Sequence, residues 1–202
     1  MKLYFTPGAC SLSPHIALRE ANLPFELEKV DLGAKRTKSG ADYKAISPKG
    51  YVPALQLDDG QVLTEGPAIV QYIADRKPES KLAPQAGTLE RYRLQEWLNF
   101  ISTEVHKTFS PLFNPKLPEE TRQMFKQRLA QRFDFLEQNL DGKSFLLGDT
   151  FTVADGYVFV VMRWAPPQGF DLGRWPNLKA YVERIAARPA VRAALEVEGL
   201  SK

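Results

Sequence analysis

Short apolar runs alternate with helical patterns over the first part of the chain. The alternation predicts a strand at residues 2–6, a helix from about Ser13 to Ala21 and a second strand at residues 26–30. Two strands joined through a helix form a βαβ unit, in which the strands run parallel. A polar, glycine-containing segment follows at residues 33–40. The chain therefore begins as an α/β fold.

A hairpin and a further helix complete this part. Residues 52–57 and 61–64 form two mainly apolar runs on either side of Asp58-Asp59-Gly60, and Asp-Gly between such runs is a strong hairpin signal. A helix is predicted from Pro67 to about Arg76, because proline is favoured in a first helical turn and the apolar residues that follow share one face. The predicted order is β-α-β-α-β-β-α.

The remainder of the chain has helical patterns. Residues 77–88, KPESKLAPQAGT, contain two prolines, one glycine and no helical period, which is typical of a linker between domains. We therefore predict a domain at residues 1–76, the linker, and an all-helical domain at residues 89–202. Its expected helices span residues 88–109, 118–140 and 176–187.

One stretch of the helical part is almost entirely apolar, namely FTVADGYVFVVMRWA at residues 151–165. Thr152, followed three residues later by Asp155, forms a capping-box pattern in front of it. We expect a buried helix here, at the centre of the second domain.

Composition and charge exclude several classes of protein. The chain is 44% hydrophobic and 25% charged, as in globular proteins with a sizeable core. No stretch has the length of a secretory signal or a transmembrane helix. The net charge is +3, but basic residues are interleaved with acidic ones, so neither a nucleic acid nor a membrane is an expected partner. A single cysteine allows no internal disulfide and fits no zinc spacing, so we expect a cytoplasmic protein without a metal.

Cys10, the only cysteine, lies where the first strand gives way to the first helix, which begins near Ser13 or one turn earlier at Ser11. Free backbone N–H groups and the positive end of the helix dipole favour a thiolate at such a place. The alternative is a small buried apolar residue. The position in a glycine-containing turn favours a functional role.

Two further motifs permit both a structural and a functional interpretation. Val52 precedes Pro53 at a strand start and could offer its backbone to an extended ligand, although the residues alone favour an ordinary trans proline in an edge strand. Glu65 precedes a helix start, so a carboxylate stands beside backbone donors, and that pair suits an α-amino acid zwitterion. By itself, Glu65 is better interpreted as a first-turn acid that complements the helix dipole.

A polar stripe follows the first long helix of the second half. Its members recur at three- and four-residue steps and have charged neighbours: Glu96, Asn99, Thr103 and His106, flanked by Glu104 and Lys107. Such a stripe is normally a solvated face, and a lone histidine is more often structural than catalytic. The pattern alone therefore assigns this stripe no function.

Four motifs occur in one order along the chain: PGACSLSPHIALRE at residues 7–20, SPKG at 47–50, LTEGPAIVQYIAD at 63–75 and WLNFISTEVHKTFSPLF at 97–113. Together they resemble the bacterial beta-class glutathione transferases, over essentially the whole chain. The resemblance implies a thioredoxin-like N-terminal domain, an all-α C-terminal domain and a homodimer.

The resemblance also implies contacts with glutathione. Cys10 would lie at the glutathione sulfur, and Val52, before a cis Pro53, would pair its backbone with the cysteinyl part. Glu65 and Gly66 would bind the γ-glutamyl end. Many relatives have serine in place of this glycine, so one hydroxyl contact is absent here.

Further contacts are implied outside this group. Lys35 would face the glycyl carboxylate, while His106 and Lys107 would approach the thiol from the helical domain. The γ-glutamyl group of the partner subunit would be reached by three residues of the stripe, namely Asn99, Thr103 and Glu104. An apolar and aromatic pocket for a hydrophobic electrophile would be formed by Phe109, Phe113 and Trp164.

The expected function is that of a detoxifying glutathione transferase, in which the thiolate of glutathione as co-substrate attacks a hydrophobic electrophile. Because Cys10 can itself exchange with a disulfide, glutathione-dependent thiol–disulfide exchange is an alternative. Some relatives remove halogen from chlorinated metabolites, so reductive dehalogenation is another. A non-catalytic glutathione-binding module is the third, since fold does not fix function.

Overall fold

A computed structural model describes residues 1–201 and divides the chain into two compact units. The first comprises Met1–Ala83 and the segment from Ala187 onward, and the second comprises Pro84–Ala186. The expected α/β architecture followed by an all-α part is confirmed. The expected domain at residues 89–202 differs from this division, because the last helix packs in the first unit.

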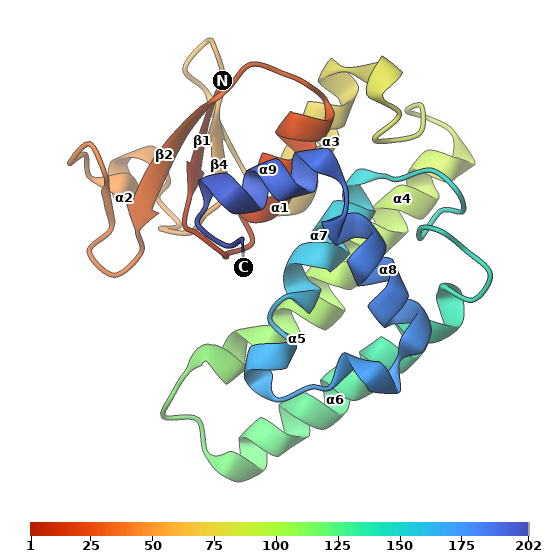
Figure 1. Cartoon of the computed structure of the whole chain (residues 1–202). Coiled ribbons are helices and arrows are strands. Elements are labelled where there is room, and N and C mark those ends of the chain that lie inside the picture. Colours follow the sequence, from red (N-terminus) through yellow and green to blue (C-terminus); the bar gives the residue numbers. More distant parts are fainter. Residues whose placement is uncertain (202) are drawn as a thin grey trace. The chain divides into compact units, whose positions relative to one another are not determined.

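The first unit is built on a five-stranded sheet in the order β3-β2-β1-β4-β5 (Figure 1). The strands β1 (Lys2–Phe5) and β2 (Glu26–Asp31) pair in parallel orientation, and α1 (Leu12–Glu20) connects them, as the βαβ pattern predicted. The strands β4 (Ala54–Gln56) and β5 (Val62–Thr64) form the predicted hairpin, and β4 is antiparallel to β1.

One strand was not predicted. β3 (Arg36–Thr37) lies in the polar segment and pairs with β2 in antiparallel orientation. Two residues are too few to show an alternating pattern, and the pairing depends on contacts with a distant part of the sequence. The short helix α2 (Tyr43–Ile46) follows it.

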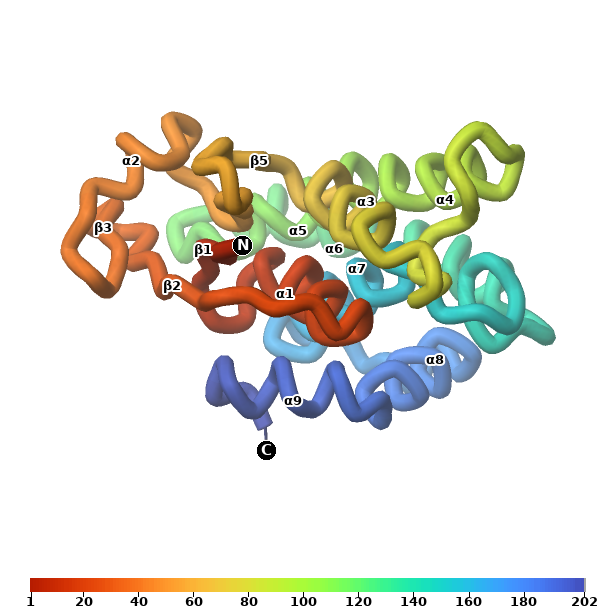
Figure 2. The backbone as a smooth tube through the Cα atoms, turned by 90° about the horizontal axis from the view of Figure 1, so that it is seen from above, coloured from red at the N-terminus to blue at the C-terminus, as the bar shows by residue number. Residues whose placement is uncertain are grey.

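Three helices of the first unit pack together. α3 (Gly66–Arg76) and α9 (Pro189–Val197) both contact α1, and Figure 2 shows α9 running alongside α1. The buried residues of α9 include Val191 and Ala194. Just before α9, the guanidinium of Arg188 donates to both carboxylate oxygens of Glu20, at 2.6 and 2.8 Å. These contacts explain why the C-terminal segment belongs to the first unit.

The second unit is helical. Its long helices are α4 (Leu89–Phe100), α6 (Glu119–Asn139), α7 (Val153–Met162) and α8 (Pro176–Ala186). Every residue of α7 is buried, and the predicted capping box between Thr152 and Asp155 is present. α7 is therefore the buried helix that the sequence indicated. In residues 1–201, no helix is both long and apolar enough to cross a membrane.

The helix predicted at residues 88–109 is interrupted in its winding. Between α4 and α5 (Lys107–Phe109), the segment Ile101–His106 is a π-helix, a rare form that often occurs at functional sites. Two threonine hydroxyl groups donate hydrogen bonds to backbone carbonyl oxygens here. Thr103 Oγ1 donates to Asn99 O, and Thr108 Oγ1 donates to Glu104 O. Such side-chain bonds compete with regular helical geometry.

Candidate functional site

The turn that carries Cys10 is fixed at its base by hydroxyl groups. α1 begins at Leu12, and the start near Ser11 is the one observed. Ser11 Oγ accepts from Thr6 N at 3.1 Å and donates to Thr6 O at 3.2 Å. Thr6 Oγ1 in turn donates to Val30 O at 2.8 Å. These bonds tie the turn to both β1 and β2.

The Cys10 thiol faces the loop that precedes β4. Its Sγ donates to the carbonyl oxygen of Val52 at 3.2 Å, and the residue is half-buried. The Val52–Pro53 peptide bond is cis, so the form implied by the resemblance is confirmed. The thiol and the backbone expected to pair with the cysteinyl part of glutathione are therefore neighbours.

The same loop contacts the other expected glutathione residues of this unit. Lys35 Nζ donates to Gly50 O at 3.0 Å, and Lys49 Nζ lies 2.5 Å from Glu65 Oε1. A Cβ atom built on Gly66 would meet Pro53 Cγ at 4.0 Å. The loop at residues 49–53 thus brings together Cys10, Lys35, Val52, Pro53, Glu65 and Gly66.

Glu65 has a backbone conformation that few residues other than glycine adopt. Its φ is 70° and its ψ is 116°, at the N-cap position of α3. Its side chain makes no hydrogen bond to the helix it precedes, and the carboxylate faces Lys49 beside the N–H of Gly66, whereas Ala68 N and Ile69 N both donate to Glu65 O. Strained backbone of this kind is concentrated at sites that hold ligands.

A buried network behind the Cys10 turn involves a residue that sequence reasoning missed. Glu198 Oε2 accepts from Gly8 N at 3.0 Å, and Glu198 Oε1 lies 2.8 Å from His15 Nδ1. Both side chains are fully buried. Arg19 Nε donates to His15 Nε2 at 2.9 Å, which leaves the proton on Nδ1 to be donated to Glu198. The C-terminal segment therefore supports the turn.

In the second unit, His106 is held by its Nδ1 atom. This atom lies 2.6 Å from the hydroxyl of Tyr157, and the ring meets that of Trp164 edge to face at 5.0 Å between centroids. Burial, with a smaller effect of Lys107, lowers the pKa of His106 from 6.5 to about 4. The imidazole is therefore neutral at physiological pH.

The expected electrophile residues form one aromatic cluster with His106. The Trp164 ring meets those of Phe109 and Phe113 nearly at right angles, at 5.8 and 5.4 Å. Phe113 is 52% exposed, whereas Phe109 is fully buried. Phe109 therefore supports the Trp164 ring from the core instead of offering its own surface to a ligand.

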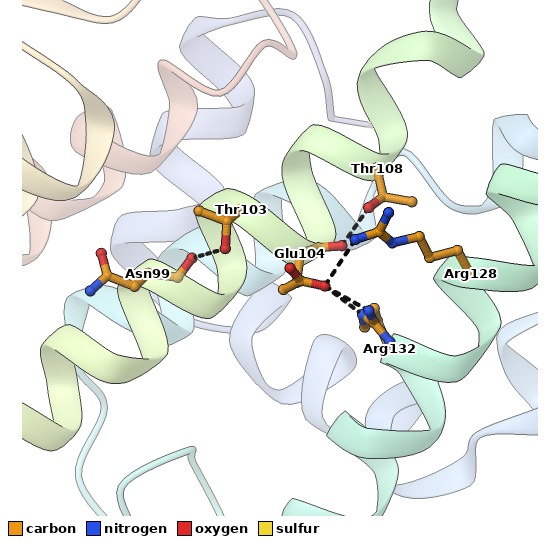
Figure 3. A network of polar contacts seen from close by, with 6 residues as sticks. All are labelled: Asn99, Thr103, Glu104, Thr108, Arg128 and Arg132. Atoms are coloured by element: carbon orange, nitrogen blue, oxygen red, sulfur yellow. Dashed lines mark hydrogen bonds and ion pairs between the residues drawn. The ribbon is translucent and has the colours of Figure 1, made fainter.

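The three residues expected to reach a partner subunit are not equivalent. Figure 3 shows the Glu104 carboxylate directed toward Arg128 and Arg132 of α6, with Asn99 and Thr103 on another side. Glu104 Oε2 accepts from Arg132 at 2.6 and 3.0 Å and from Arg128 at 3.4 Å. These guanidinium groups lower the pKa of Glu104. Asn99 and Thr103 are exposed.

Within residues 1–201, no cluster of three or more histidine, cysteine, aspartate or glutamate side chains could hold a metal ion. The arrangement in the first unit instead suits an extended, zwitterionic thiol ligand. It offers a carboxylate, a lysine, backbone pairing groups and a cysteine around one loop.

Comparisons with known proteins give a consistent result. The family models for the N-terminal and C-terminal domains of glutathione S-transferase match residues 8–76 and 100–189. Over 200 residues the chain is 46% identical to glutathione S-transferase GstA of Escherichia coli O157:H7, covering 99% of this chain and 100% of the relative.

Two solved structures superpose over the whole length. A sphingomonad glutathione S-transferase complexed with glutathione is 47% identical, with a TM-score of 0.96 and complete coverage of both chains. The bacterial beta-class glutathione S-transferase of Sphingomonas chungbukensis is 48% identical, with the same TM-score and coverage.

Proposed function

The chain belongs to the glutathione S-transferase family, in its bacterial beta class, and we propose that it conjugates glutathione to hydrophobic electrophiles. The observation that carries this proposal is the grouping of Cys10, Val52 and Glu65 around one loop of the first unit. Each of the three offers what a different part of the tripeptide requires.

Glutathione carries one α-ammonium group and two carboxylates on an extended backbone. Glu65 binds the α-ammonium group, and the N–H of Gly66 at the start of α3 binds the neighbouring carboxylate. Val52 pairs its backbone with the cysteinyl residue, and Lys35 faces the glycyl carboxylate. Lys49, which contacts Glu65, gives way to the ligand ammonium.

The reaction is a substitution at carbon. The bound thiol releases its proton to solvent water, and the thiolate is stabilised by the N-terminus of α1 and by donors from His106 and Lys107. The sulfur then forms a bond to the electrophilic carbon while the leaving group departs with the electron pair of the broken bond. Trp164 and Phe113 contact the apolar part of the electrophile. No step requires a metal.

Thiol–disulfide exchange is a second candidate, because the half-buried Cys10 thiol lies beside the cysteinyl-pairing backbone of Val52. Cys10 would attack a glutathione mixed disulfide, release the other thiol and become glutathionylated. A second glutathione would then free Cys10 and leave as oxidised glutathione. In reductive dehalogenation, glutathione would first displace the halide to form a thioether. Cys10 would then attack the thioether sulfur, the carbon would leave with the electron pair of the C–S bond and take up a proton, and a second glutathione would free Cys10 as oxidised glutathione forms.

Parallel assays on the wild type and on Cys10→Ala test these proposals. The panel contains aryl halides, epoxides and chlorinated acids, together with a glutathione mixed disulfide. Conjugation should survive the substitution in large part, because the nucleophile is the sulfur of glutathione, whereas exchange should nearly vanish. A wild type that turns over none of the electrophiles contradicts conjugation. Unchanged exchange in Cys10→Ala removes Cys10 from that mechanism.

The proposal includes a cytoplasmic homodimer that acts in detoxification. The cytosol maintains the reduced glutathione that the enzyme consumes. Asn99 and Thr103 would contact glutathione of the partner subunit, and Glu104 would do so through Oε1, since its contacts with arginine use Oε2. Sedimentation measured beside glutathione binding decides the point, because dilution should lower dimer content and affinity together. A monomer with full affinity contradicts it.

A further inference from the structure

We infer that Tyr157 is a positioning residue that fixes His106 as its Nε2–H tautomer, so that the imidazole presents a hydrogen-bond donor to the reacting sulfur. The inference rests on the proposed function for the role of the sulfur. The tautomer itself follows from contacts inside the second unit. It would make His106 a stabiliser of the thiolate and exclude it as the base that removes the thiol proton.

The geometry leaves one ring nitrogen for a ligand. His106 Nδ1 is occupied by the Tyr157 hydroxyl at 2.6 Å, and the two rings are nearly perpendicular, at 87°. The Trp164 ring holds the imidazole from a second direction, at 5.0 Å between centroids. The orientation of the ring is thereby set, and Nε2 is the atom through which His106 can act.

The Tyr157 hydroxyl is itself held in place. Tyr157 is 4% exposed and lies in the buried helix α7, near its capped N-terminus. That terminus is anchored by Asp155, which accepts from Thr152 N at 2.7 Å and from Tyr181 Oη at 2.8 Å. A rigid supporting group of this kind orients a functional side chain.

Acidity decides which partner donates. The His106 ring is neutral at pH 7, because burial lowers its pKa to about 4, so it has one N–H and one acceptor nitrogen. A phenol, with a pKa near 10, is a stronger acid than the N–H of neutral imidazole. The Tyr157 hydroxyl therefore donates to Nδ1, and the ring proton resides on Nε2.

The chemical consequence concerns the sulfur. A protonated Nε2 cannot accept the proton of a thiol, but it can donate to a thiolate, and hydrogen bonds to a charged acceptor are the stronger kind. Tyr157 acts through His106 and needs no contact with the substrate.

Nitrogen-15 NMR of the ring nitrogens tests the tautomer without any substrate. The chain has only two histidines, and His15, bonded to Glu198 and Arg19 in the first unit, serves as the internal reference. The wild type should show His106 with Nε2 protonated and Nδ1 unprotonated. In Tyr157→Phe, the His106 signals should move toward a mixture of tautomers while those of His15 stay unchanged. A wild-type ring protonated on Nδ1 overturns the inference.

Kinetics test the role of the donor. Tyr157→Phe should lower kcat for conjugation roughly 5- to 30-fold, the effect of one hydrogen bond of 1–2 kcal/mol, with glutathione affinity within twofold. The exposed Tyr92→Phe in α4 is the matched control and should have no effect. His106→Gln keeps a side-chain N–H donor without a base and should retain measurable conjugation.

A double-mutant cycle completes the test. Adding Tyr157→Phe to His106→Gln should cost little more, because the tyrosine acts through the imidazole. Equal losses from Tyr157→Phe in both backgrounds overturn the inference. If the wild type shows the Nε2–H tautomer but conjugates no electrophile, it is the proposed function that fails, and the tautomer assignment stands.

Discussion

Glu65 combines an unfavourable backbone with a useful charge. Its positive φ costs free energy in a residue with a Cβ atom, and its carboxylate is 66% exposed beside Lys49. An exposed ion pair of this kind contributes little to stability. The conformation is therefore better explained by the ligand that the carboxylate is placed to meet.

We predict that Glu65→Ala weakens glutathione binding by roughly 10- to 100-fold, since a hydrogen-bonded charge is worth about 1.5–3 kcal/mol. Titration calorimetry provides the measurement. Glu79→Ala is the matched control, because Glu79 is 65% exposed and also pairs with a lysine, Lys77. An affinity of the Glu65 variant within twofold of wild type would argue against the assigned role.

Gly66 offers a test by addition of a group. Its φ is not in the left-handed region, and a Cβ atom would make only an ordinary contact with Pro53. Gly66→Ser should therefore be accommodated, and its hydroxyl should raise glutathione affinity about 2- to 10-fold, as one added hydrogen bond would. Gly66→Ala is the control, because it lowers the conformational entropy of the unfolded chain as serine does but adds no hydroxyl. Equal affinities in the serine and alanine variants would show that the hydroxyl makes no contact.

Residues that the sequence could indicate are those whose chemistry is local. Cys10 and Glu65 each precede a helix, and that position alone suggests a thiolate or a ligand-binding acid. Lys49, Tyr157 and Glu198 could not be found this way. Each matters through a partner distant in sequence, such as His15 for Glu198, and no spacing along the chain encodes that contact.

At the scale of elements, helices with clear start signals were predicted best. The helix expected at residues 118–140 spans Glu119–Asn139, and that expected at 176–187 spans Pro176–Ala186. The π-helical winding of Ile101–His106 was not predicted. The spacing of apolar residues indicates which face of a helix is buried. It does not distinguish an α-helical turn from a π-helical turn in which side-chain hydroxyl groups bond to the backbone.

The capping box of α7 gives a prediction about stability. Thr152→Ala removes a donor to the buried Asp155 carboxylate and the N-cap of a buried helix, so we expect a loss of about 1–3 kcal/mol in the free energy of unfolding. Thr88→Ala removes the N-cap of α4, in which Thr88 Oγ1 accepts a hydrogen bond from Arg91 N at 3.3 Å in a partly buried position. This substitution should lower the free energy of unfolding by about 0.5–1 kcal/mol. Urea unfolding compares them. Equal losses would show that burial adds nothing to the cap.

At the scale of the whole molecule, the resemblance drawn from four motifs is confirmed by full-length relatives. The path of the chain was harder to predict than the family. The C-terminal segment returns to the first unit through α9 and Glu198, although it follows an unbroken series of helices in the sequence. Helical periodicity predicts that a segment forms a helix but does not indicate which unit the helix packs against, so α9 could not be assigned to its unit from the pattern.

The neutral His106 makes the stability of the protein depend on pH. Its pKa is about 4 in the folded chain, against 6.5 as the ordinary value, so between these limits the unfolded chain binds more protons. Stability from this residue is complete above pH 6.5 and is lost as the pH falls toward 4. With about 1.4 kcal/mol for each pKa unit, the loss amounts to about 3 kcal/mol at most.

Other groups also make the stability depend on pH, so the test compares two proteins. Burial raises the pKa of Asp155, which works in the opposite direction, while arginine contacts lower that of Glu104, which adds to the loss in acid. Urea unfolding of wild type and His106→Gln between pH 4.5 and 7.5, at steps of about 0.5, cancels these shared contributions. The wild type should lose more stability than the variant as the pH falls, and parallel curves would show that His106 is not held neutral by the fold.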